Sequence, residues 1–148
     1  MKKVHIAAAV AAVALLLGGC GTKNIYDVPL PDQPVAFNTK LVTDPNDESI
    51  DYAALDFKGK TYVGYGELNG ELTESDIGSC LGYLVQDGQK IEEIRIFTLA
   101  SDPDMNYIFT MDNQGIMEKP TFFRNEETRE RDIDTPAFIE SSGYTYWE

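Results

Sequence analysis

The sequence predicts a small, mainly β domain built on one antiparallel sheet, with a β-rich α+β arrangement as the alternative. Its 148 residues suit a single domain. Short runs rich in β-branched and aromatic residues recur along it, as at residues 94–99 and 107–111. Glycine-containing turns separate these runs, and short strands at such close spacing are typical of antiparallel β proteins.

The first half of the predicted domain contains one clear hairpin. Residues 54–57 and 61–65 flank Lys58-Gly59-Lys60, which places a glycine at the turn. Asn69-Gly70 resembles a second hairpin turn, but a two-residue turn there would pair Leu68 with Glu71 on one face. We therefore expect a loop that leads into a short helical turn at residues 73–76, which have the S/T-x-x-D/E form of a helix start.

The second half contains further strand candidates. Residues 80–85 are followed by an Asp87-Gly88 turn, and residues 94–99 are apolar on both faces, which indicates a central strand. The remaining expectations are a strand at 107–111, a turn at 112–115, a loop or short helix at 125–134, and a final strand at 143–147. A further candidate strand consists of residues 116–117 and 121–123. Pro120 interrupts it and indicates an edge strand or a bulge.

The N-terminus has the anatomy of a secretory signal peptide. Lys2 and Lys3 form a basic start, and every residue from 6 to 17 is Ile, Ala, Val or Leu. This run of 12 residues is shorter than the roughly 20 that a membrane-spanning helix needs.

Leu17-Gly18-Gly19-Cys20 resembles the lipobox of bacterial lipoproteins. The resemblance implies cleavage before Cys20, with a diacylglycerol thioether, and so two acyl chains, on that residue. Two chains anchor a protein stably to a membrane. The expected localisation is the cell membrane, facing its extracytoplasmic side. An ordinary signal peptide with an incidental cysteine, or an uncleaved anchor, is the alternative.

These features divide the chain into a signal peptide at residues 1–19, a lipidated N-terminus with a proline-rich tether at residues 20–34, and a globular domain at residues 35–148. Pro29, Pro31 and Pro34 favour an extended tether without regular structure. Residues 59–62, 76–78, 80–83, 102–104 and 106–107 also resemble stretches of small lipoproteins of Gram-positive bacteria that have no established activity. That resemblance brings no site residues with it.

The charge of the chain excludes one class of partner. Twenty-five acidic and 12 basic residues give a formal net charge of −13, and no basic cluster follows Lys3, so we expect no binding to nucleic acid. The acids gather at residues 40–57 and 125–148. We interpret both stretches as solvated faces, with binding faces as the alternative.

The residue inventory argues against an enzyme. The chain has one histidine, His5, and it lies in the predicted signal peptide, so the mature protein would have no imidazole for acid–base catalysis or zinc binding. Once Cys20 is lipidated, Cys80 has no disulfide partner; its apolar neighbours favour a buried thiol over a reactive one. Acids near Asp44 and Asp102 alternate as calcium ligands do, but both stretches lack the glycine and glutamate of an EF-hand.

Cys20 is therefore the one predicted site residue, and we predict no catalytic residue, metal ligand or cofactor. We expect a non-catalytic binding or interaction module, with an accessory subunit of an envelope complex as the first alternative and a carboxylate- or thiol-based enzyme as the second. Aromatic rings are the main candidates for a partner contact, although most should fill the core. They are Tyr62, Tyr65, Tyr83, Tyr107, Tyr144, Tyr146 and Trp147, of which the last three are expected to be the most exposed.

Overall fold

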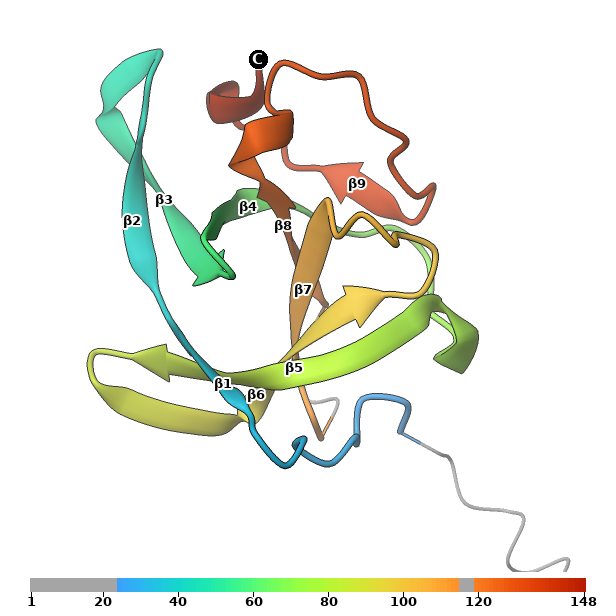
Figure 1. Ribbon diagram of the computed structural model, residues 1–148. Helices are drawn as coiled ribbons and strands as arrows, with labels where there is room; N and C mark the ends of the chain where they lie inside the picture. Colours follow the sequence, from blue (N-terminus) through green and yellow to red (C-terminus); the bar gives the residue numbers. More distant parts are fainter. Residues whose placement is uncertain (1–23, 115–118) are drawn as a thin grey trace, which may run out of the picture.

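The computed structural model describes residues 24–114 and 119–148 and confirms a mainly β protein (Figure 1). One strongly curled sheet contains nine strands in the order β1-β5-β6-β7-β8-β4-β3-β2, with β9 paired to β4. The strands are β1 (Val35–Asn38), β2 (Lys40–Asp44), β3 (Asp47–Phe57), β4 (Lys60–Leu68), β5 (Ile77–Gln86), β6 (Gln89–Leu99), β7 (Tyr107–Asp112), β8 (Thr121–Asn125) and β9 (Ile139–Ser141). Three short 3-10 helices complete the fold: η1 (Glu74–Asp76), η2 (Glu126–Thr128) and η3 (Thr145–Trp147).

Every strand pair is antiparallel except β1 with β5, which is parallel. Strands β1 and β2 lie at opposite ends of the strand order, although only Thr39 separates them in sequence. The chain thus passes directly from one end of the sheet to the other, and this continuous segment draws the two ends together (Figure 1).

The local turn signals are confirmed. Strands β3 and β4 are joined by Lys58-Gly59, both with positive φ (49° and 76°), as a tight hairpin turn requires. Asp87-Gly88 joins β5 to β6 in the same way, with φ values of 51° and 76°. Thr73 and Asp76 form the expected capping box at η1.

Two expectations about strands are wrong. Residues 143–147 form no strand; η3 lies there, and the last strand is β9 at Ile139–Ser141. The strand that follows Pro120, β8, is central, between β7 and β4, and not at an edge. The predicted strand residues 116 and 117 lie outside the described residues. Strands β1 and β2 and the first half of β3 were not predicted, because polar and acidic residues obscure their alternation.

The sheet is buried on both faces at β6, β7 and β8. Inside the curl, residues from both ends of the strand order meet: Phe37 of β1 stacks on Phe57 of β3 with ring centroids 5.6 Å apart. On the outer face of β6, β7 and β8, a second cluster is built on Phe97, Phe109 and Phe122, whose rings contact one another in sequence. The prediction that residues 94–99 are central is therefore confirmed.

The described part of the proline-rich segment has no strand or helix, yet it packs against the outer cluster. Ile25, Tyr26 and Val28 all contact it, and the Tyr26 ring meets the Phe97 ring edge-on at 6.5 Å. The Asn24 side chain donates a hydrogen bond to the carbonyl of Asn113 at 2.8 Å. Residues 24–28 therefore belong to the folded body.

Gly82 allows the parallel pairing of β1 with β5. A Cβ atom at this position would lie 1.9 Å from the carbonyl oxygen of Val35 and 2.6 Å from its nitrogen. Both of these are backbone atoms, so β1 would have to move to accept a methyl group.

We predict that Gly82→Ala lowers the free energy of unfolding by about 1–3 kcal/mol, the range for an added methyl in a packed site. Urea unfolding followed by circular dichroism measures this. Gly64→Ala is the matched control, because its nearest neighbour would be 3.5 Å away. Equal losses in the two variants would contradict the role of Gly82.

Candidate functional site

A groove of about 440 Å³ lies where β3 and β4 diverge, and it combines aromatic rings with carboxylates. Its walls include Tyr52, Tyr65 and Tyr144, together with the acids Asp51 and Glu67. Ala53, Gly64, Gly66, Thr121, Phe123 and Ser142 complete the lining.

The groove exists because one edge of β4 serves two partners. Strand β3 pairs with β4 only from Ala54↔Val63 to Phe57↔Lys60. Beyond that point β9 takes the same edge, from Gly66↔Ser141 to Leu68↔Ile139, while β8 occupies the opposite edge. Strand β3 is thereby separated from β4, and the space between them opens to solvent.

Gly66 makes the approach of β9 possible. A Cβ atom on Gly66 would lie 2.1 Å from the carbonyl oxygen of Glu140, which no packed structure tolerates. The backbone amide of Ser142 then donates to the carbonyl of Tyr65 at 3.0 Å, which extends the contact of this segment to the bulged part of β4.

The side chain of Trp147 forms a hydrogen bond with the backbone of β4 at Gly64. Its indole Nε1 donates a hydrogen bond to the carbonyl of Gly64 at 2.8 Å. This carbonyl is the one that would accept from Ala53 if the β3–β4 ladder continued. The indole therefore satisfies the carbonyl at the point where the ladder ends.

Two tyrosines form the aromatic wall. The rings of Tyr52 and Tyr144 lie with centroids 4.7 Å apart and an interplanar angle of 35°. Tyr144 is 38% exposed, and Tyr52 is half-buried. Such a pair presents apolar ring surface to a ligand.

Arg124 packs against Tyr65, one of the residues that line the groove. It is 9% exposed, and its guanidinium lies over the rings of Tyr65 and Trp147, 5.4 and 5.0 Å from their centroids. It also donates to the hydroxyl and the carbonyl of Thr128 at 2.8 and 2.7 Å and to the carbonyl of Arg131 at 3.2 Å. Its position is thus fixed by rings and neutral acceptors.

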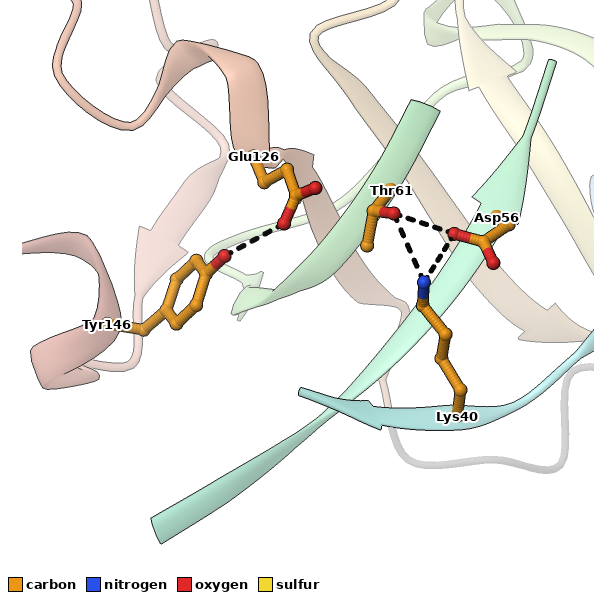
Figure 2. A network of polar contacts seen from close by, with 5 residues as sticks. All are labelled: Lys40, Asp56, Thr61, Glu126 and Tyr146. Carbon is orange, nitrogen blue, oxygen red and sulfur yellow. Dashed lines mark hydrogen bonds and ion pairs between the residues drawn. The ribbon is translucent and has the colours of Figure 1, made fainter. Parts of the chain in front are cut away.

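Hydrogen bonds tie η3 to the body around the groove. Tyr146 donates to Glu126 Oε2 at 3.0 Å (Figure 2), and Arg129 donates to the carbonyl of Tyr146 at 2.6 Å. The Thr145 hydroxyl donates to Asp44, which also accepts from the Tyr52 hydroxyl at 3.3 Å.

A separate polar contact links side chains of β2, β3 and β4. Lys40 pairs with Asp56 at 2.8 Å, and Thr61 donates to the same Asp56 oxygen at 2.7 Å (Figure 2). The hydrogen bond from Lys40, with its charge, lowers the pKa of Asp56 despite a smaller opposing effect of burial. This triad lies away from the groove residues and is a structural contact.

The predicted aromatic set divides between core and surface. Tyr62, Tyr83 and Tyr107 are buried, as the core interpretation expected, and Tyr144 is exposed. Tyr146, however, is only 5% exposed; the expectation that it is among the most exposed rings is wrong, because η3 turns its ring onto Ala54 and Val63. Tyr65 and Trp147 are half-buried.

Cys80 is half-buried against the outer cluster, and its thiol donates a weak hydrogen bond to the carbonyl of Gly82 at 3.8 Å. Burial raises the pKa of this thiol, and the opposing influences of the Gly82 contact and Arg95 are smaller. Arg95 is far from Cys80 in the sequence and was therefore not predicted as a cation near this thiol. The antiparallel pairing of β5 with β6 brings the two residues close, because Cys80 pairs with Phe97 and Tyr83 pairs with Arg95.

The acids considered as calcium ligands serve in turns instead. Asp102 accepts a hydrogen bond from the amide of Tyr107 at 2.8 Å, and Asp44 accepts from the amide of Asn46 at 2.8 Å. Within residues 24–114 and 119–148, no group of three or more histidine, cysteine or acidic side chains gathers to hold a metal ion.

A second hollow, of about 550 Å³, is lined by charged and polar residues of both signs without an aromatic ring: Lys60, Asp104, Asn106, Asn125, Glu127, Arg131, Asp132 and Ile133. Its Asn125 is already engaged, since its side chain accepts from the Glu127 amide at 3.1 Å. The groove between β3 and β4 differs from this hollow because aromatic rings lie beside its carboxylates.

Comparison with models of known protein families, with curated protein sequences and with solved structures gives no match. None of the helical segments in the described part of the chain has the length and apolar character that crossing a membrane requires.

We predict that Arg124→Met lowers the free energy of unfolding by about 2–3 kcal/mol, because buried acceptors lose a charged donor. The emission of Trp147, the one tryptophan in the chain, should also change when the guanidinium leaves its ring. Arg131→Met is the control, since Arg131 is exposed and such surface changes cost within about 0.5 kcal/mol. Equal effects of the two variants would contradict this role.

We predict that Cys80 is alkylated by iodoacetamide more slowly in the folded protein than in guanidinium, and with a higher pH midpoint. A Cys20→Ser variant leaves Cys80 as the one thiol. Because the pKa of Cys80 is higher in the folded than in the unfolded protein, its thiol contributes to the free energy of unfolding. This contribution is fully present at pH values below the pKa of the unfolded state and is lost as the pH rises through the pKa of the folded state. A midpoint below that of the unfolded chain would show that Arg95 outweighs burial.

Proposed function

We propose that this protein is a lipid-anchored, extracytoplasmic binding protein without catalytic activity, and that the groove between β3 and β4 is its binding site. The observation that carries the proposal is the groove itself, where Tyr52 and Tyr144 present ring surface beside Asp51 and Glu67. Rings flanked by a few polar groups are characteristic of ligand sites.

The anchor rests on the N-terminal sequence. If Cys20 carries the lipid, the packing of residues 24–28 on the body leaves residues 21–23 as the connection. Fully extended, three or four residues span on the order of 10–14 Å. The proposed anchor would thus hold the body close to the membrane surface.

The proposal of a non-catalytic protein rests on the proposed mature chain. Removal of residues 1–19 would leave no histidine. Among the groups that line the groove, the remaining acids and tyrosines are suited to binding. An accessory subunit of an envelope complex stays the second candidate, and the acidic lining of the groove favours it where the partner is basic.

Lipidation has a direct test with a matched control. We predict that cells fed an alkyne fatty acid label the wild-type protein and Cys80→Ala, and fail to label Cys20→Ala. Loss of the label from Cys80→Ala, or its retention in Cys20→Ala, would overturn the anchor.

Binding at the groove is tested by photocrosslinking in the native cell. A benzoylphenylalanine at Ser142, an exposed lining residue, should give one defined adduct, whereas the same group at exposed Glu92 of β6 should give none. Cys20→Ala should reduce the adduct by removing the protein from the membrane. With the protein confirmed on the membrane, the same pattern at both positions, or no adduct at Ser142, would contradict a binding site here.

A further inference from the structure

The edge of β3 beside the groove lacks a strand partner. Strand β3 pairs with β2 through Ala53 and Asp51, but its pairing with β4 ends at Ala54. A register shift on the β2 side precedes Asp51. The regular unpaired edge in the described chain is therefore short, and it runs from Asp51 to Ala53.

The backbone groups of this edge face the groove. In a two-residue hairpin the residues that flank the turn exchange both hydrogen bonds, so Phe57 directs its backbone groups toward β4. The direction alternates along a strand, so Ala53 and Asp51 direct theirs to the same side. The position of Ala53 agrees, since its carbonyl oxygen lies 3.5 Å from where a Cβ on Gly64 would be.

Strand β4 does not complete this ladder. The carbonyl of Gly64 accepts from the Trp147 indole, so it is not available to the amide of Ala53, and the β3–β4 register ends before Asp51. Ala53 is exposed, although the two residues that follow it in β3 are fully buried. Exposed strand edges of this kind are templates for an added strand.

The charges around the edge select the added strand. Asp51 and Glu67 line the groove, and Glu67 lies directly opposite Glu140 in the β4–β9 register. Neither glutamate forms an ion pair with a described residue. Like charges opposite each other across a sheet are destabilising, and a lysine or arginine placed between them would relieve this repulsion.

We propose that the groove binds a short extended segment of a partner protein that carries a lysine or arginine and adds as a strand to the Asp51–Ala53 edge of β3. This rests on the proposed binding function and names its ligand class. The backbone of β3 would supply hydrogen bonds, Tyr52 and Tyr144 would pack against one side chain, and the carboxylates would bind the cation. A second copy of this chain fits less well, because its net charge is −13 and acidic faces would meet.

The test uses capped pentapeptides of alternating lysine and valine with the lipidated protein in neutral detergent micelles. Hydrogen exchange followed by mass spectrometry should show protection of the β3 segment that contains Asp51 and Ala53. A glutamate–valine peptide should bind at least 10-fold more weakly. A lysine–valine peptide with N-methylated alternate amides should give no protection, because it lacks the strand hydrogen bonds.

Two variants separate the backbone from the charge. Glu67→Gln, an exposed change that leaves the fold intact, should weaken the lysine–valine peptide several-fold. Ala53→Pro removes one amide on the side away from β2 and should abolish the protection; exchange in β6 and β7 serves as its check on folding. In both variants, Ser142 crosslinking reports separately on binding in the cell.

Each contrary outcome is distinct. Binding of the lysine peptide without protection of β3 would indicate surface charge attraction and overturn strand addition. Equal binding of the glutamate peptide, or no binding of either peptide, would overturn the ligand class. Protection of β3 that rises with protein concentration alone would assign the edge to a second copy. If the Ser142 adduct forms while the peptides fail, the binding function stands and this inference falls.

Discussion

Most of what is distinctive in this protein depends on how one edge of β4 is shared. A strand edge has one row of hydrogen-bonding groups, and β3 and β9 each take half of it. Gly66 admits the β9 backbone at a distance that any Cβ would prevent. The indole of Trp147 takes the carbonyl between the two halves. The groove is the space that this division leaves.

The rest of the sheet makes that division stable. The β6–β8 region is covered on both faces, with one apolar cluster inside the curl and another beneath β9 and the N-terminal segment. Strand β9 is only three residues long, too short to hold its place by backbone hydrogen bonds alone. Its Ile139 is anchored in the outer cluster, so the same burial that stabilises the core also holds the groove open.

How much of this the sequence could predict follows from the range of each interaction. The β3–β4 and β5–β6 hairpins were predictable because Lys58-Gly59 and Asp87-Gly88 determine their turns locally. Strand β9 and the parallel pairing of β1 depend on contacts with residues more than 40 positions away, and their few apolar residues carry no periodic signal. Residues 143–147 alternate like a strand, but their tyrosines and tryptophan pack as a 3-10 helix because β9 already occupies the edge of β4.

The candidate site was predictable from the sequence only in part. Tyr144 was predicted to be exposed and a candidate for partner contact, because an aromatic ring in a polar stretch is a recognisable signal. Its partner Tyr52 lies in the acidic stretch of residues 40–57, which reads from sequence as a solvated face, and only the fold brings the two rings within 4.7 Å.

The described N-terminal segment, residues 24–34, and the groove occupy different parts of the molecule. Residues 24–34 lie at the bottom of Figure 1, whereas η3, which follows Tyr144 of the groove wall, lies at the top. With a connection of three or four residues to Cys20, the bottom of the body would face the membrane. The groove, bordered by η3, would then be presented to the extracytoplasmic space. The groove carboxylates, Asp51 and Glu67, would be repelled by anionic lipid headgroups, which favours an orientation that turns the groove away from the membrane and leaves the edge of β3 open to a basic segment that arrives from outside.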